Sequence, residues 1–282
     1  MEDFAEYILS EQDCIQKMMI AYYMSRKTGI FFDKSIILRT QIAKMFLNYA
    51  SLDVDKNEVL TAMLLCNCKK VDNPQKIGKL ETYAKEGAEY LATLGFDKKF
   101  CNICEGLNRY VPAEPRKKES DVLELVDQFT GLILRRAERE AFTPREALII
   151  LKERNLKHVY NRYLEDFIIF VEAMEDVYIK DTIEVPVIRK LASLAEKEQD
   201  VKSFISKLSS RYSDEIDRLM GINIKEQAEE FLYKDIEKTQ NKAKTVHRYT
   251  RVIEKKNSER ALFSKEVAER ILNHKSMYRI EE

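Results

Sequence analysis

The chain has 282 residues, long enough to bury most of its unfolded surface in one or two domains. Its 48 lysines and arginines balance its 48 aspartates and glutamates, which argues against an overall field that attracts nucleic acid or a membrane surface. Only 7 glycines and 5 prolines supply turn signals, so the chain should consist of long elements, and with 34% charged residues it is predicted to be all-α.

No apolar run reaches the roughly 18 residues that a membrane span needs, and no signal peptide is recognisable. We therefore expect a cytoplasmic protein without a membrane partner.

The five cysteines form an odd set, which is typical of reduced thiols. Cys66 and Cys68, and also Cys101 and Cys104, have spacings that zinc ligands can have. Their apolar surroundings favour buried free thiols, and we expect no metal and no cofactor.

The first predicted helix covers residues 3–25, with Ser10 and Asp13 as a local cap or break and Gly29 just past its end. A second helix is predicted over residues 33–49, with an aspartate as its cap and mostly core residues along it.

A third helix should begin at Asp55, because Glu58 follows at the spacing of a capping box. It is expected to run through Leu65 into Cys66 and Asn67.

A fourth helix is predicted over residues 121–133, where apolar residues recur at steps of three and four. Asp127 lies beside this apolar face, and a carboxylate there must reach solvent, pair with a cation or bind a metal. After a charged connector, Thr143 should cap the next helix, with Pro144 at its first position and Glu146 closing a capping box.

These residues resemble the HD-GYP branch of the HD-domain phosphohydrolases. That family has a metal-binding aspartate in a D-x-[YF]-x-[AG]-L run, then an R-P-Y-R element and a [ST]-P-x-E-A-L helix start. Residues 127–132 match the first motif, Arg136 and Arg139 keep both arginines of the second, and residues 143–148 match the third without a gap. The resemblance covers about residues 30–178 and implies an HD-domain-like helical bundle over residues 30–180. An N-terminal helix over residues 1–29 is predicted to precede it, and a partly heptad-patterned helical extension over residues 181–282 is predicted to follow it.

The metal-binding histidines of that family are replaced wherever the resemblance places them. The histidine positions hold Leu38, Cys66, Tyr83, Leu107 and Asn108. Asn67 stands where the family has a metal-binding aspartate, and Arg109 stands in place of a glutamate. Asp127 is retained, and Lys70 stands where the family has a lysine that contacts phosphate. One carboxylate does not hold a hydrolytic metal cluster, so we expect no catalytic residues and no enzymatic activity.

The polar residues left at these positions are predicted to form a vestigial pocket: Cys66, Asn67, Lys70, Tyr83, Asn108, Arg109, Asp127, Arg136 and Arg139. Asp127 and Lys70 are expected to form an ordinary ion pair there. Arg136 and Arg139 are expected to tie their connector to carboxylates or to a helix C-terminus. The alternative is that these cations bind a phosphate.

We therefore expect a catalytically inactive HD-GYP-like protein that acts as a binding or scaffolding module in bacterial-type signalling. One alternative is a sensor that binds a nucleotide such as cyclic di-GMP through Lys70, Asn108, Arg109 and Arg136 without hydrolysing it. Another is a divergent metal-dependent phosphodiesterase that uses the cysteine, asparagines and aspartate of the pocket as ligands.

Apolar residues in the segment 187–220 follow a nearly heptad pattern, at positions 191, 194, 201, 205, 208, 212, 216 and 219. Only Glu198 interrupts it. The segment is predicted either to bind a protein partner or a second copy as a coiled coil, or to lie back on the domain.

Residues 238–260 carry eight lysines and arginines against two glutamates, and a solvated helical face is favoured there over nucleic-acid binding.

Overall fold

The structure is a computed structural model, and it describes residues 3–70, 80–107, 116–136, 139–156, 161–179 and 184–221. All of these belong to one compact unit, formed by Met1–Asp72 and Leu80–Ile222. Asn108 and Arg109 lie outside the described residues, as do the end of the predicted C-terminal extension and its basic stretch at 238–260.

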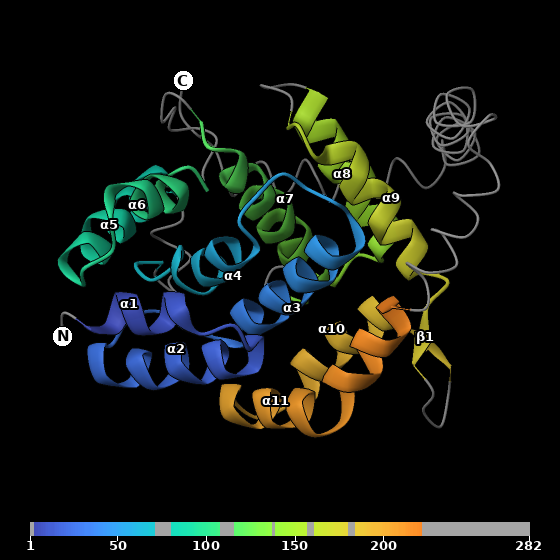
Figure 1. Cartoon of the computed structure of the whole chain (residues 1–282). Coiled ribbons are helices and arrows are strands. Elements are labelled where there is room, and N and C mark those ends of the chain that lie inside the picture. The colour runs from blue at the N-terminus through green and yellow to red at the C-terminus, as the bar shows by residue number, and fades with distance from the viewer. Residues whose placement is uncertain are drawn as a thin grey trace. The chain divides into compact units, whose positions relative to one another are not determined.

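Helices follow one another along almost the whole described chain (Figure 1). In order they are α1 (Asp3–Ser10), α2 (Cys14–Thr28), α3 (Lys34–Tyr49), α4 (Lys56–Leu65), α5 (Leu80–Thr93), α6 (Lys98–Glu105), α7 (Lys118–Ile133), α8 (Pro144–Leu156), α9 (Leu164–Met174), α10 (Val187–Lys197), α11 (Val201–Lys207) and the π-helical turn η2 (Leu208–Tyr212). The all-α prediction is confirmed for this part of the chain. Its strands are the two-residue antiparallel pair β1 (Tyr178–Ile179) and β2 (Val185–Pro186), just before α10.

Aspartate caps set the starts of the first long helices as the sequence predicts. Asp13, Asp33 and Asp55 each accept a hydrogen bond from the backbone N–H three residues later, at 2.8, 3.2 and 3.0 Å. The predicted break after Ser10 is therefore real, and it separates α1 from α2. Gly29 ends α2 in the left-handed conformation, with φ of 67°.

The two predicted capping boxes differ in the structure. Thr143 and Glu146 form both halves of theirs, with the Thr143 N–H donating to Glu146 Oε2 at 2.9 Å. Glu58 instead directs its carboxylate to Lys99 on α6, at 2.6 Å. The prediction of a reciprocal box at Asp55 is wrong in this half, because an ion pair to a neighbouring helix takes the side chain.

α3 lies at the centre of the described unit (Figure 1). Residues 36–43 are all buried, and the helix packs against α4 and α7 and also against α10 and α11. A helix buried all round is expected to carry few charges, so its one charged residue in this stretch, Arg39, needs a partner inside the protein.

The segment after β2 lies back on the rest of the unit. It breaks at Glu198, and Asp200 caps α11 by accepting from the Ser203 N–H at 2.8 Å. The π-helical turn is wider than an α-turn, so apolar residues spaced four apart stay on one face, and these are buried: Leu208, Tyr212, Ile216 and Met220. Of the two predicted arrangements, the structure has the second, with the apolar stripe packed mainly on α2 and α3.

Two polar contacts help to hold this segment on α3. Lys34 donates to the Glu198 carbonyl at 2.5 Å, and Lys44 pairs with Asp217 at 2.8 Å.

No helix in the described ranges is both long enough and apolar enough to cross a membrane.

Candidate ligand-binding site around Asp127

Packing of α7 against α3 and α4 brings the predicted pocket residues together. Asn67 follows the end of α4, where its side-chain amide donates to Asp127 Oδ1 on α7 at 3.0 Å. Cys66, Lys70 and Tyr83 lie close enough for their electrostatic interactions with Asp127 to shift pKa values. The structure therefore assembles a large part of the predicted set from three separate elements.

The partner of Asp127 is Arg39, a residue that the sequence analysis did not place in the pocket. Arg39 Nη1 lies 2.6 Å from Asp127 Oδ1, and Arg39 Nε donates to the Met63 carbonyl at 3.1 Å. Arg39 as a whole is 1% exposed. The predicted ion pair between Asp127 and Lys70 is thus wrong, because a buried guanidinium already holds the carboxylate.

Arg39 was missed as the partner of Asp127 because the resemblance directed attention to the neighbouring position, Leu38. The resemblance assigns a metal-ligand position to Leu38, which is fully buried in the apolar core. Arg39, one residue later, points to Asp127 from the central helix. The available sequence signal was a single charge within a helix stretch otherwise made of apolar and uncharged polar residues.

Asp127 is a carboxylate in this environment. Burial raises its pKa, but the charges of Lys70 and Arg39 act in the opposite direction, together with hydrogen bonds from Arg39 and Asn67. The net result is a pKa below the ordinary value for aspartate.

Cys66 and Tyr83, which occupy predicted ligand positions, are neutral. Burial raises the pKa of the Cys66 thiol to about 11, although Arg39 acts against this rise. Burial also raises the pKa of Tyr83, and the negative charge of Asp127 adds to the effect. A metal ion that bound either group would have to displace its proton.

The other cysteines behave in the same way. All five are buried and free, and burial raises the pKa of Cys68 to about 12 and that of Cys104 well above the ordinary value. Within the described ranges, no three or more histidine, cysteine, aspartate or glutamate side chains are grouped so that they could hold a metal ion.

The connector arginines lie at the C-terminal end of α7. Arg139 donates to the Leu132 carbonyl at 2.9 Å and to the Gly131 carbonyl, and its guanidinium lies 4.9 Å from the centre of the Phe142 ring. The prediction that it ties the connector to a helix C-terminus is confirmed. Arg136 lies over Gly131, where its Nη2 would be 2.6 Å from an added Cβ, and its positive charge acts against the rise that burial causes in the pKa of Tyr83.

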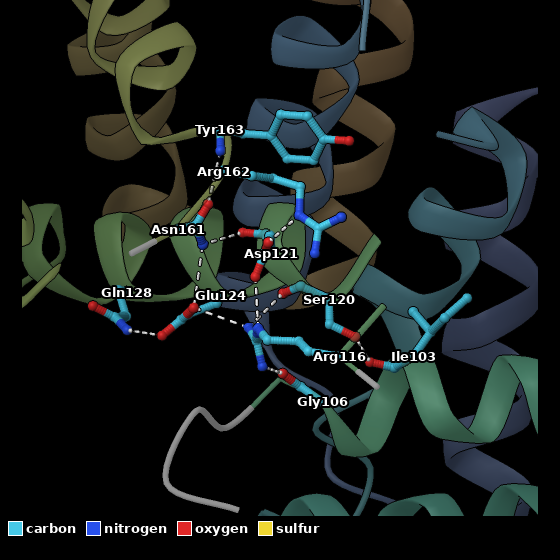
Figure 2. Close-up of polar contacts among 10 residues, drawn as sticks. All are labelled: Ile103, Gly106, Arg116, Ser120, Asp121, Glu124, Gln128, Asn161, Arg162 and Tyr163. Carbon is cyan, nitrogen blue, oxygen red and sulfur yellow. Dashed lines mark hydrogen bonds and ion pairs between the residues drawn. The ribbon is translucent and has the colours of Figure 1, made fainter. Parts of the chain in front are cut away.

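A second polar cluster on α7 was missed by the sequence analysis (Figure 2). Asp121 and Glu124 are 3% and 2% exposed, and Arg116 pairs with both, at 2.6 and 2.9 Å. Arg162 reaches the other oxygen of Asp121 at 2.6 Å, and Asn161 donates to Glu124 at 3.2 Å. The sequence signal for this cluster was the presence of two acids, Asp121 and Glu124, within the apolar pattern of the predicted helix.

This cluster ties three chain segments together. Arg116 also donates to the Gly106 carbonyl at 2.5 Å, and Ser120 donates to the Ile103 carbonyl at 2.9 Å, which fixes the end of α6 against α7 (Figure 2). Asp121 and Glu124 are matched by the charges of Arg116 and Arg162. We therefore interpret the cluster as structural and Asp127 with its neighbours as the candidate site.

Comparison with known proteins gives no relative to set beside this geometry. No family model matches the chain, no curated protein matches it, and no solved structure matches it. The resemblance to the HD-GYP branch therefore stays a prediction that rests on the sequence motifs.

Proposed function

We propose that this chain is a catalytically inactive HD-GYP-like protein that acts as a binding or scaffolding module in bacterial-type signalling. The observation that carries the proposal is the buried ion pair between Arg39 and Asp127, with Asn67 donating to the same carboxylate oxygen. This oxygen is the strongest acceptor in the pocket, and a guanidinium occupies it.

Electrostatics support this proposal over a divergent metal-dependent enzyme. A divalent ion bound to Asp127 would lie beside the Arg39 guanidinium, and the two cations would repel each other. To move Arg39 away would break a buried pair, at about 3–5 kcal/mol, and would strand the guanidinium in the core. Cys66 and Tyr83 would supply negative charge only by losing their protons, which burial opposes in both.

The nucleotide-sensing alternative has one observation in its favour. Lys70 lies close enough to lower the pKa of Asp127, yet it makes no ion pair with any residue of the described chain. A phosphate could use this ammonium. Asn108 and Arg109, which this alternative also requires, lie outside the described residues.

Metal content and turnover test the inactive state. After incubation with manganese, iron or zinc and gel filtration, the protein should retain no stoichiometric metal and should hydrolyse neither a generic phosphodiester nor a cyclic dinucleotide. The proposal is refuted if the parent chain retains one or more ions and hydrolyses one of these substrates, and Asp127→Ala loses both the ions and the hydrolysis. The same ions should then persist in the control Asp217→Ala, which removes an exposed carboxylate paired with Lys44.

The scaffolding role needs a surface, and the apolar stripe of 187–220 is already buried in the chain. We therefore expect partner contacts on the polar side of this segment, which includes the exposed Lys202 and Arg211. Sedimentation of the full chain tests self-association, which should weaken in the charge reversal Lys202→Glu. A chain that is monomeric at every concentration would refute self-association through this segment.

A further inference from the structure

Lys17 is a buried lysine without an ion-pair partner among the described residues. It lies on α2 and is 0% exposed, and its Nζ donates to the Ile8 carbonyl of α1 and, at 2.8 Å, to the Thr61 hydroxyl of α4. A neutral amine has two N–H groups and an ammonium has three, so these two acceptors leave one proton of the ammonium without a partner. The surroundings of Lys17 thus favour its neutral form.

The acids that act on Lys17 are engaged elsewhere. Glu11 accepts from two backbone N–H groups of the connection between α1 and α2, at 2.8 Å each, and Asp55 caps α4. Both act to raise the pKa of Lys17, but burial outweighs them and lowers it to about 8. Cys14, one turn earlier on α2, is a neutral thiol, because burial raises its pKa to about 12. Glu6 of α1 is exposed.

Two side-chain donors hold the C-terminal end of α1, which packs on α2 and α4 (Figure 1). Lys17 supplies one of them from α2, to the Ile8 carbonyl. Asn57 supplies the other from α4, to the Leu9 carbonyl. Residues 11–13 separate α1 from α2 and are exposed or half-exposed, so α1 can move at this connection while α2 and α4 keep their own packing. Such a movement would bring Lys17 Nζ into contact with water.

We propose that α1 is a strap whose opening is favoured by protonation of Lys17 and whose closure is favoured by the neutral amine. The closed strap keeps Nζ away from water, which disfavours the charged form. In the open strap the same nitrogen is hydrated and binds its proton up to a higher pH. A rise in pH through this range therefore favours closure. The device does not depend on Asp127 or on the proposed function.

Opening of the strap would uncover apolar surface. Ala5 and Ile8 of α1 are 3% and 0% exposed in the closed form. Phe4 contacts Phe96 edge-on, with 6.0 Å between the ring centres, and Phe96 is 4% exposed. All of these side chains would gain contact with water when α1 moves. The pH would therefore control how often this surface is exposed.

Hydrogen exchange of the full chain, followed by mass spectrometry of peptides from α1, tests the proposal. The parent chain and Lys17→Met are compared at the same pH, so that the effect of hydroxide on intrinsic exchange cancels. With a pKa of about 8 in the closed form and 10.5 in the open form, the opening of α1 in the parent relative to the variant should fall about tenfold from about pH 7 to about pH 9. Amides of α1 should also exchange faster than those of α9, because the strap opens without global unfolding.

Asn57→Ala is the matched control, since it removes the other donor to α1 and keeps Lys17. It should increase the opening of α1 about five- to tenfold at both pH values and leave the pH dependence unchanged. The titration of Lys17 in the parent chain, followed through its side-chain carbon signals by NMR, provides a measurement that needs no variant. An opening ratio that is equal at the two pH values, titration of Lys17 at the ordinary value for lysine, or equal protection of α1 and α9 would overturn the inference.

Discussion

Replacement of Arg39 by methionine should lower the free energy of unfolding by about 2–4 kcal/mol. The Arg39 side chain is 2% exposed, and it donates to Asp127 Oδ1 at 2.6 Å and to the Met63 carbonyl at 3.1 Å. Methionine keeps much of the apolar volume but donates to neither oxygen. Loss of one partner from a buried pair costs about 3–5 kcal/mol, and the 22% exposure of the Asp127 side chain lowers this range.

Urea denaturation followed by circular dichroism measures the change, with Asp127→Asn and the double variant completing a mutant cycle. Lys44→Met is the control, because it breaks an ion pair at 2.8 Å whose Asp217 side chain is 44% exposed. This more exposed pair should contribute at most about 1 kcal/mol. A loss below about 1 kcal/mol in Arg39→Met, or additivity with Asp127→Asn, would refute the assignment of Asp127 to Arg39.

The stabilisation by the ion pair of Arg39 and Asp127 should also depend on pH. Burial raises the pKa of Asp127, but Lys70 and Arg39 outweigh it, so the folded-state pKa lies below the unfolded value of about 3.9. The unfolded chain therefore binds the proton first as pH falls. The contribution of the pair is complete above the unfolded pKa and is lost as pH falls through the folded pKa. The difference between Arg39→Met and the parent chain should shrink accordingly below about pH 4.

Three further predictions concern other buried groups. Burial lowers the pKa of Lys17 to about 8 from 10.5, so at this group the unfolded chain binds more protons between these values. The stability of the parent chain relative to Lys17→Met should therefore rise with pH across this window, as measured by urea titrations of both chains. Gly106→Ala should destabilise by about 1–3 kcal/mol in the same assay, because the added Cβ would lie 2.4 Å from Ser120 Oγ. Gly131→Ala should be milder, since the added Cβ meets only the end of the long Arg136 side chain. Arg116→Met should cost about 3–5 kcal/mol or prevent folding, because two carboxylates that are 3% and 2% exposed lose a shared partner.

Local signals in the sequence predicted much of the fold. Aspartate caps, a C-terminal glycine and the Thr143 capping box depend on side chains within a few residues of the backbone that they bind, so their spacing is visible in the chain. Glu58 shows the limit of such signals. Its spacing fits a box, but Lys99, 41 residues away, takes its carboxylate.

The candidate site was predicted only in part, because spacing in the sequence does not show which distant residues helix packing brings together. Motif spacing brought Asn67 and Asp127 into one set, and the structure joins them at 3.0 Å. The cation could not be predicted by spacing, because Arg39 reaches Asp127 across 88 residues through helix packing. The Arg116 cluster was missed because its acids lie on a helix face that the apolar pattern assigned to the core.

The presence of a lone acid at position 127 has an explanation that needs no metal ion. Arg39 is buried in the central helix, and a guanidinium there requires an anionic partner because its desolvation is not otherwise repaid. Among the described residues, Asp127 is the carboxylate within ion-pair distance of it. Neutral side chains therefore suffice at positions 66, 67 and 83, whereas a neutral residue at 127 would leave Arg39 unpaired. The arrangement follows from charge balance around one buried arginine.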